Sequence, residues 1–302
     1  MTFQDANPRD GAVGCSTLIY LATAAYLAIG VLTYLAWRIS GNPAWIDGFF
    51  GLPGGLLTVA LALVQLTYSV RLCSQFLSGE PLNRAWQLIS ASAGCDLVSS
   101  LNVQIFSVDS FWNPVTHLAG WSKSSGATIR QVGLIAGGPL RFALLALGLL
   151  YTLRIYRRSG FLGRLTRADW TLLSVVAIYV INEFRDLWIA LQHGKHPALG
   201  EILNWPVDPL LWVLLAEAML LYRSTRRMGP GWIGRCWVAF SAGIALVVLG
   251  DISIWAMSYG YLPYPWSSIG WYLWLPSSAA FAVAPVYQMD VIRKASSRRF
   301  TR

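Results

Sequence analysis

The 302-residue chain carries too few charges and too many apolar residues for a water-soluble protein, with 55% hydrophobic and 12% charged residues. A soluble chain of this length has roughly twice that charged fraction. The formal net charge of +9 comes from arginines and lysines in short loops between apolar blocks, a placement typical of membrane topology and not of a nucleic-acid-binding face. Composition and pattern together predict a multi-pass membrane protein with no nucleic-acid partner.

The apolar residues come in blocks of about 20, the length that a helix needs to cross the roughly 30 Å hydrocarbon layer of a bilayer. We predict a single all-α membrane domain of eight transmembrane helices, with no separate soluble domain. The predicted spans are residues 15–37, 49–71, 84–106, 136–156, 169–192, 207–223, 232–257 and 268–288.

Basic residues predict the orientation of these helices. They follow the second, fourth and sixth spans and fill the C-terminal tail, whereas the opposite loops hold only Arg38, Lys123, Arg130 and Lys195. Cytoplasmic loops are the ones enriched in arginine and lysine, so we predict that both termini are cytoplasmic. The protein is expected in the inner membrane of a bacterium.

A repeat runs through the predicted spans. Four alternate spans end with a tyrosine just before a basic segment: Tyr68, Tyr151, Tyr222 and Tyr287. The helices that follow the first three begin with the similar sequences RAW, RADW and RCW, and their outer portions carry Asp96, Asp186 and Asp251. Because equivalent features keep the same membrane side, we interpret the chain as four helical hairpins repeated in parallel.

Ionisable residues inside the spans are the candidate functional residues, because a charge at membrane depth is costly unless it faces protein or a water-filled cavity. The set consists of Glu183, Arg185, Asp186, Glu217, Asp251, Asp96 and Arg141. One interpretation is structural, with buried ion pairs that fix the register of the helices. The other is a polar cavity on the outer side, suited to a cation, a proton or a polar ligand.

Helical geometry separates the charges of the fifth span. Glu183 and Asp186 share one face at a spacing of three residues, whereas Arg185 points elsewhere and could pair with an aspartate of a neighbouring helix. Asp186 has equivalents in the repeat, but Glu183, Arg185 and Glu217 have none. The functional hypothesis therefore rests mainly on these three residues and on the HGKH sequence at His193–His196, which also has no equivalent.

Cofactor sites are not expected. The three histidines, His117, His193 and His196, all lie in outer segments, where solvated loop residues are a better interpretation than a metal site. No span holds the histidine pair that a b-type haem needs, and no span holds a lysine for a retinal Schiff base. Most of the 15 tryptophans lie in or near the outer half, as an interfacial belt or as the lining of a cavity.

The hairpin from Asp186 to Arg227, which reads DLW…G…WPVDPLLWVLL…LLYRSTRR, resembles bacterial multi-helix membrane sensor modules. The segment from Asp251 to Lys294 matches the same pattern in part. Such modules precede diguanylate cyclase or histidine kinase domains, so the resemblance implies a sensing role. The chain ends at Arg302 with a short basic tail in place of an output domain, and the resemblance then implies action through a protein partner.

Three functions remain open from the sequence. The first is a non-enzymatic membrane module, a sensor, scaffold or complex subunit with a polar, Trp-rich cavity on the extracytoplasmic side. The second is a proton- or cation-coupled transporter or channel that uses Glu183, Asp186, Glu217 and Asp251. The third is a membrane enzyme that acts on lipid through outer histidines and acids. The expected partners are the lipid bilayer and a protein in the membrane or cytoplasm.

Overall fold

The computed structural model describes residues 9–42, 44–45, 52–77, 79–105, 131–193, 205–227, 232–258, 260–261 and 269–299. The long helices there are α1 (Arg9–Ser40), α3 (Leu52–Cys73), α4 (Pro81–Ser99), α7 (Arg141–Arg158), α8 (Arg167–Gln192), α10 (Val207–Arg227), α11 (Trp232–Ser258) and α12 (Ile269–Arg299). Two π-helical segments, η1 (Ser100–Ile105) and η2 (Ala136–Leu140), continue α4 and precede α7. The described chain holds no strand, so the predicted all-α class is confirmed, and each predicted span falls on a helix.

The helix ends follow from local sequence. Helix α1 is closed by Gly41, whose φ of 68° lies in the left-handed region that glycine adopts without strain. Helix α4 starts with a proline after Glu80. Proline lacks a backbone N–H, but the N–H groups of the first helical turn have no partner within the helix, so no hydrogen bond is lost. Helix α8 starts with a capping box, in which Thr166 and Asp169 each satisfy the backbone N–H of the other.

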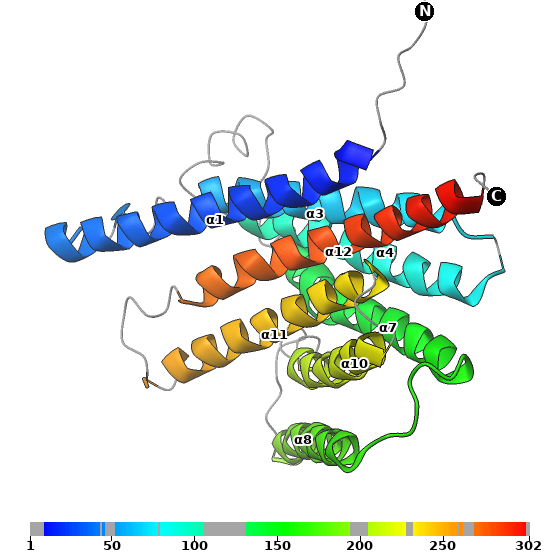
Figure 1. The fold of residues 1–302 in the computed structure, drawn as a ribbon. Coiled ribbons are helices and arrows are strands. Elements are labelled where there is room, and N and C mark those ends of the chain that lie inside the picture. The colour runs from blue at the N-terminus through cyan, green and yellow to red at the C-terminus, as the bar shows by residue number, and fades with distance from the viewer. Residues whose placement is uncertain are drawn as a thin grey trace, which may run out of the picture.

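Six helices form a closed ring (Figure 1). Helices α3, α4, α7, α10, α11 and α12 pack in that order, and α12 packs back against α3. Glycines allow close approach at two of these contacts. A Cβ on Gly148 of α7 would lie 2.8 Å from Ile89 and 3.1 Å from the carbonyl oxygen of Ala85 on α4, and one on Gly243 of α11 would lie 2.9 Å from the ring of Phe281 on α12.

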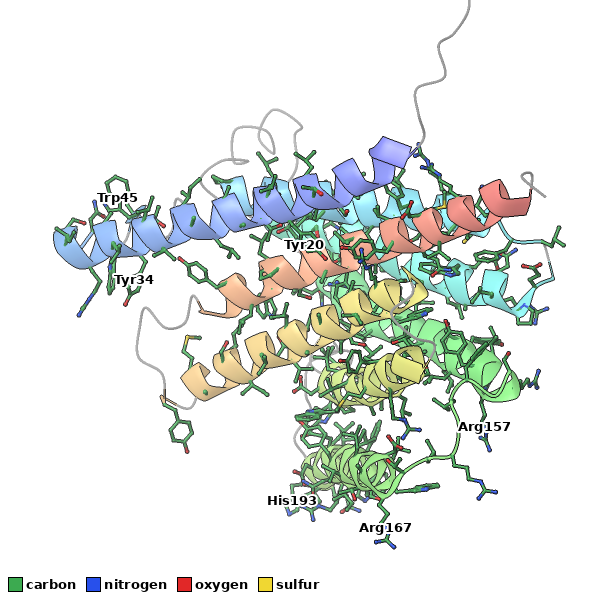
Figure 2. The ribbon with its side chains drawn as sticks, in the orientation of Figure 1. Tyr20, Tyr34, Trp45, Arg157, Arg167 and His193 are labelled. Carbon is green, nitrogen blue, oxygen red and sulfur yellow. The ribbon has the colours of Figure 1, made fainter. Side chains whose placement is uncertain are left out.

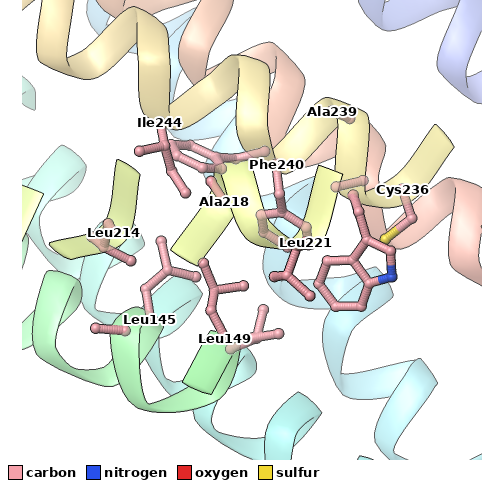
Figure 3. Close-up of a cluster of buried hydrophobic side chains, with 14 of the residues drawn as sticks. Leu145, Leu149, Leu214, Ala218, Leu221, Cys236, Ala239, Phe240 and Ile244 are labelled. Carbon is pink, nitrogen blue, oxygen red and sulfur yellow. The ribbon is translucent and has the colours of Figure 1, made fainter. Parts of the chain in front are cut away.

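Buried aromatic side chains fill the ring interior toward the end that holds both chain termini. Trp86, Trp237 and Phe240 form a cluster with ring centroids 5.7–6.1 Å apart, and Phe281 lies 6.0 Å from Phe240. The Trp237 indole N–H donates to the hydroxyl oxygen of Tyr156 at 2.7 Å. Leucines from α7 and α10 pack beside this cluster, as Figure 3 shows. This half of the ring is a filled core.

Helices α1 and α8 lie outside the ring, where α1 packs on α12 and α8 packs on α10 (Figure 1). Four helical segments of the described chain are long and apolar enough to cross a membrane: Gly14–Ser40, Pro53–Cys73, Gln131–Arg158 and Gly234–Ile254. The start of α1 and the end of α12, which are the described residues nearest the two termini, lie at the same end of the bundle. Arg157 lies toward that end and Trp45 lies at the other, as Figure 2 shows. The basic loop residue Arg157 and the opposite-loop residue Trp45 thus lie at two different ends of the bundle.

Candidate functional site

A cavity of about 500 Å³ lies inside the ring, at the end away from the chain termini. Its wall comes from the last turns of α4 and α11 and from the first turns of α7, α10 and α12, with Thr58 added by α3. The polar lining side chains are Thr58, Asp96, Ser99, Ser100, Arg141, Asp208, Asp251, Ser277 and Ser278. The chain thus brings three of the predicted candidates, Asp96, Arg141 and Asp251, into one site.

Asp96 and Arg141 form a buried ion pair between α4 and α7. The Arg141 Nη1 lies 2.7 Å from the Asp96 Oδ1, and the two side chains are only 14% and 7% exposed. The Ser92 hydroxyl donates to the backbone carbonyl of Arg141 at 2.9 Å. The guanidinium carbon also lies 5.3 Å from the ring centre of Phe142 and 5.5 Å from that of Phe281. Arg141 is therefore held in place by an ion pair, a backbone hydrogen bond and two aromatic rings.

Asp251 is held differently. The indole N–H of Trp274 on α12 donates to its Oδ1 at 3.1 Å. This approach depends on Gly250, because a Cβ at that position would collide with the Trp274 Nε1. A carboxylate accepts about four hydrogen bonds, so Asp251 keeps acceptor capacity that faces the cavity.

Distorted helix turns border the same cavity. The π-helical segment η1 begins at Ser100, and η2 contains Gly137, Gly138 and Pro139. Proline removes one backbone N–H and cannot continue a regular helix, and π turns often mark functional sites. A Cβ on Gly137 would collide with the side chain of Ser99. Segment η2 therefore packs directly on the last turn of α4 at the cavity wall.

The charge balance of the cavity is negative. The described lining residues include three carboxyl groups, on Asp96, Asp208 and Asp251, and one guanidinium, on Arg141. Because Arg141 pairs with Asp96, the described lining residues provide no further arginine or lysine for Asp208 and Asp251. Asp208 was not predicted as a site residue, although the sequence offered a signal, an acid in the first turn of a predicted span.

The charges of α8 lie elsewhere. Arg185 contacts Asp186 on its own helix at 3.0 Å, and these side chains are 62% and 52% exposed. The predicted pairing of Arg185 with an aspartate of a neighbouring helix is wrong, because Asp96 is paired with Arg141 and the cavity lining excludes α8. Glu183 is half-buried on the same helix. The geometric reason is that α8 packs on α10 outside the ring.

Glu217 lies within α10 and is 8% exposed. Its Oε2 has no hydrogen-bond partner among the described residues. It shares a helix face with Leu214 and Leu221, both fully buried in the ring core. Glu217 is therefore a buried carboxyl separate from the residues that line the cavity.

Among the histidines, His193 is exposed at the end of α8, with its Nδ1 2.8 Å from the Ile189 carbonyl oxygen. His117 and His196 lie outside the described residues. The described part of the chain contains no group of three or more metal-ligating side chains. Among the described residues, the cavity lining contains one tryptophan, Trp274.

Comparison with known proteins gives no relative from which a role could be transferred: no protein-family model, no curated protein and no solved structure matches the chain.

Proposed function

We propose that the protein is a non-enzymatic membrane module, a sensor or complex subunit, whose cavity binds a positively charged group from the extracytoplasmic side. In this proposal all eight long helices cross a bacterial inner membrane as four hairpins, with both termini in the cytoplasm. The resemblance to bacterial sensor modules is consistent with that role. The basic residues at the end that holds the termini support the orientation.

One observation carries the proposal: two carboxylates in the cavity are left without a cation to balance them. Asp251 and Asp208 line the site, and Arg141, the one guanidinium among the described lining residues, is already paired with Asp96. Trp274 and Phe142 add aromatic surface, which attracts cations through the negative faces of the rings. A cation with an apolar body matches this combination better than an anion or a neutral sugar.

The filled half of the ring favours a receptor over a channel. Trp86, Trp237, Phe240 and Phe281 are each no more than 1% exposed and lie between the cavity and the opposite end. Arg141 touches both regions, because it pairs with Asp96 at the cavity and lies over the ring of Phe281. A ligand that competes for Asp96 would therefore change the contacts of the aromatic core, which supports a signalling role.

The test is thermal unfolding of the purified protein in lipid nanodiscs with matched probes. Choline is compared with its uncharged carbon isostere, and spermidine and a lysine dipeptide extend the cationic set. We expect the cationic probes to raise the midpoint, and Asp251→Asn and Asp208→Asn to abolish that rise. Asp186→Asn on α8 is the matched control: it removes one carboxylate that lies outside the cavity, so the cationic probes should still raise its midpoint. Equal responses to choline and its isostere would contradict the proposal.

A second function, proton-coupled transport, is favoured by one observation, the buried Glu217 Oε2 without a hydrogen-bond partner among the described residues. Desolvated carboxyl groups within membrane helices commonly carry protons in transporters. The test is proton flux into liposomes that contain the protein. Transport requires flux that Glu217→Gln abolishes, whereas a receptor gives no flux above that of empty liposomes.

A further inference from the structure

A second cavity lies on the outer surface of the bundle, in the groove between α1 and α11. It has a volume of about 590 Å³, and α12 forms its floor. Small side chains make the groove deep, and they come from all three helices: Ala24, Ala239, Ala242, Ala279 and Ala280. Val238 and Tyr20, which line it, are 43% and 45% exposed, so the groove opens outward. None of these residues belongs to the cation cavity.

The groove is polar at one end only. Arg235, Tyr20 and Tyr287 line that end, and apolar side chains line most of the rest. The Ser277 hydroxyl donates to the carbonyl oxygen of Gly243 at 2.8 Å, which aligns α12 with α11. Because the two helices run in opposite directions, Tyr287 reaches about the level of Arg235. The Tyr287 hydroxyl also lies 3.5 Å from that of Tyr20. The polar end is therefore the end that holds the chain termini.

The dimensions match one leaflet of a bilayer. Arg235 and Leu246 mark the two ends of the groove on α11. At 1.5 Å per residue they are separated by about 16 Å along the helix, close to half of the roughly 30 Å hydrocarbon layer. Both flanking helices, α1 and α11, contain segments apolar enough to cross a membrane.

The geometry points to a binding site for one anionic phospholipid, with its phosphate at Arg235 and an acyl chain along the alanine-lined groove. Charge complementarity selects this occupant, because basic side chains between membrane helices bind the phosphates of anionic lipids. The Tyr20 hydroxyl, which accepts from Tyr287, donates to a phosphate or ester oxygen. The small side chains accept an acyl chain at van der Waals distance.

The proposal is tested by native mass spectrometry of the purified full chain after incubation with phosphatidylglycerol or phosphatidylcholine. We expect one retained phosphatidylglycerol per chain. Arg235→Gln should weaken its retention about fivefold, the effect of losing one guanidinium near a lipid surface. Ala242→Trp should fill the groove and abolish retention of either lipid. Circular dichroism and thermal unfolding verify that both variants fold.

Two matched variants serve as controls. Arg154→Gln removes an exposed arginine near the same end from α7, and Ala60→Trp adds the same bulk to an exposed position of α3; both should retain lipid as the wild type does. Equal retention of the two lipids, or unchanged retention in Ala242→Trp, would overturn the proposal. So would a photo-crosslinker at Val238 that captures a polypeptide in native membranes in place of lipid.

Discussion

Two arginine–aspartate pairs in this molecule have the same chemistry and opposite surroundings. Arg141 and Asp96 join α7 to its neighbour α4 at 2.7 Å, with side chains 14% and 7% exposed. Arg185 and Asp186 are neighbours along α8 at 3.0 Å, with side chains 62% and 52% exposed. The first pair connects two helices and lines a cavity, whereas the second joins neighbouring residues of one helix. Burial and connectivity, more than residue type, separate the two.

The largest expected effect comes from breaking the buried pair. Arg141→Met leaves the Asp96 carboxylate buried without its partner, which typically costs about 3–5 kcal/mol of unfolding free energy. The measurement is unfolding of the protein in mixed micelles by titration with dodecyl sulfate. Removing both charges in Arg141→Met/Asp96→Leu should recover most of the loss. If Arg141→Met is as stable as the wild type, the ion pair does not contribute to the packing of α4 on α7.

The second prediction concerns the anchor of α8. Arg223 of α10 forms an ion pair with Asp169 and donates to the carbonyl oxygens of Leu162 and Arg164, both at 3.2 Å. Arg223→Met should cost about 1.5–3 kcal/mol, as expected for lost hydrogen bonds to a charged group. The loss should be local, with faster amide hydrogen exchange in the first turns of α8 and unchanged exchange in α4. Uniformly faster exchange in both helices would contradict a local role.

The third prediction tests the close packing of the ring. Gly148→Ala places a methyl group against Ile89 and the backbone of Ala85, and such overpacking costs about 1–3 kcal/mol. Gly94→Ala is the control, because its nearest neighbour, Leu66, lies 4.0 Å from the new Cβ. That control should be neutral or stabilising, since alanine favours helix by about 1 kcal/mol over glycine. Both values come from the same micelle titration.

The smallest effect should come from the exposed pair. Arg185→Met should change the unfolding free energy by about 0–1 kcal/mol, because exposed ion pairs contribute little. The difference between the losses of unfolding free energy in Arg185→Met and Arg141→Met, measured under identical conditions, shows how much the two ion pairs differ. A loss in Arg185→Met as large as that in Arg141→Met would show that α8 is covered by a partner in the purified protein.

The positions of the helices could be predicted from the sequence, but their packing could not. Ile178, Ile181, Phe184 and Trp188 recur at helical spacing, as a core stripe does, yet they are 52–67% exposed on α8. In a membrane, lipid-facing and core-facing surfaces are both apolar. Hydrophobic periodicity therefore cannot tell which face of a helix meets protein, and the closed ring with two outer helices needed the structure.

The candidate site was predictable in part for the same reason. The depth and charge of Asp96, Arg141 and Asp251 could be read from the sequence, but their convergence depends on which helices are neighbours. Trp274 reaches Asp251 only because Gly250 leaves room for the Trp274 indole. No local sequence pattern predicts such a contact between two helices. The charges of α8 were equally conspicuous in the sequence, and the structure places them outside the ring.

The aromatic core also has an electrical consequence. A charge that crosses a membrane potential of 100 mV changes in energy by about 2.3 kcal/mol, and that potential falls across whatever layer excludes water. If the cavity is filled with water that is continuous with the extracytoplasmic solution, the layer that excludes water is formed by Trp86, Trp237, Phe240 and Phe281. A cation beside Asp251 would then lie outside most of the field. Bilayers that carry the protein should hold an applied voltage, and cation binding should hardly respond to it.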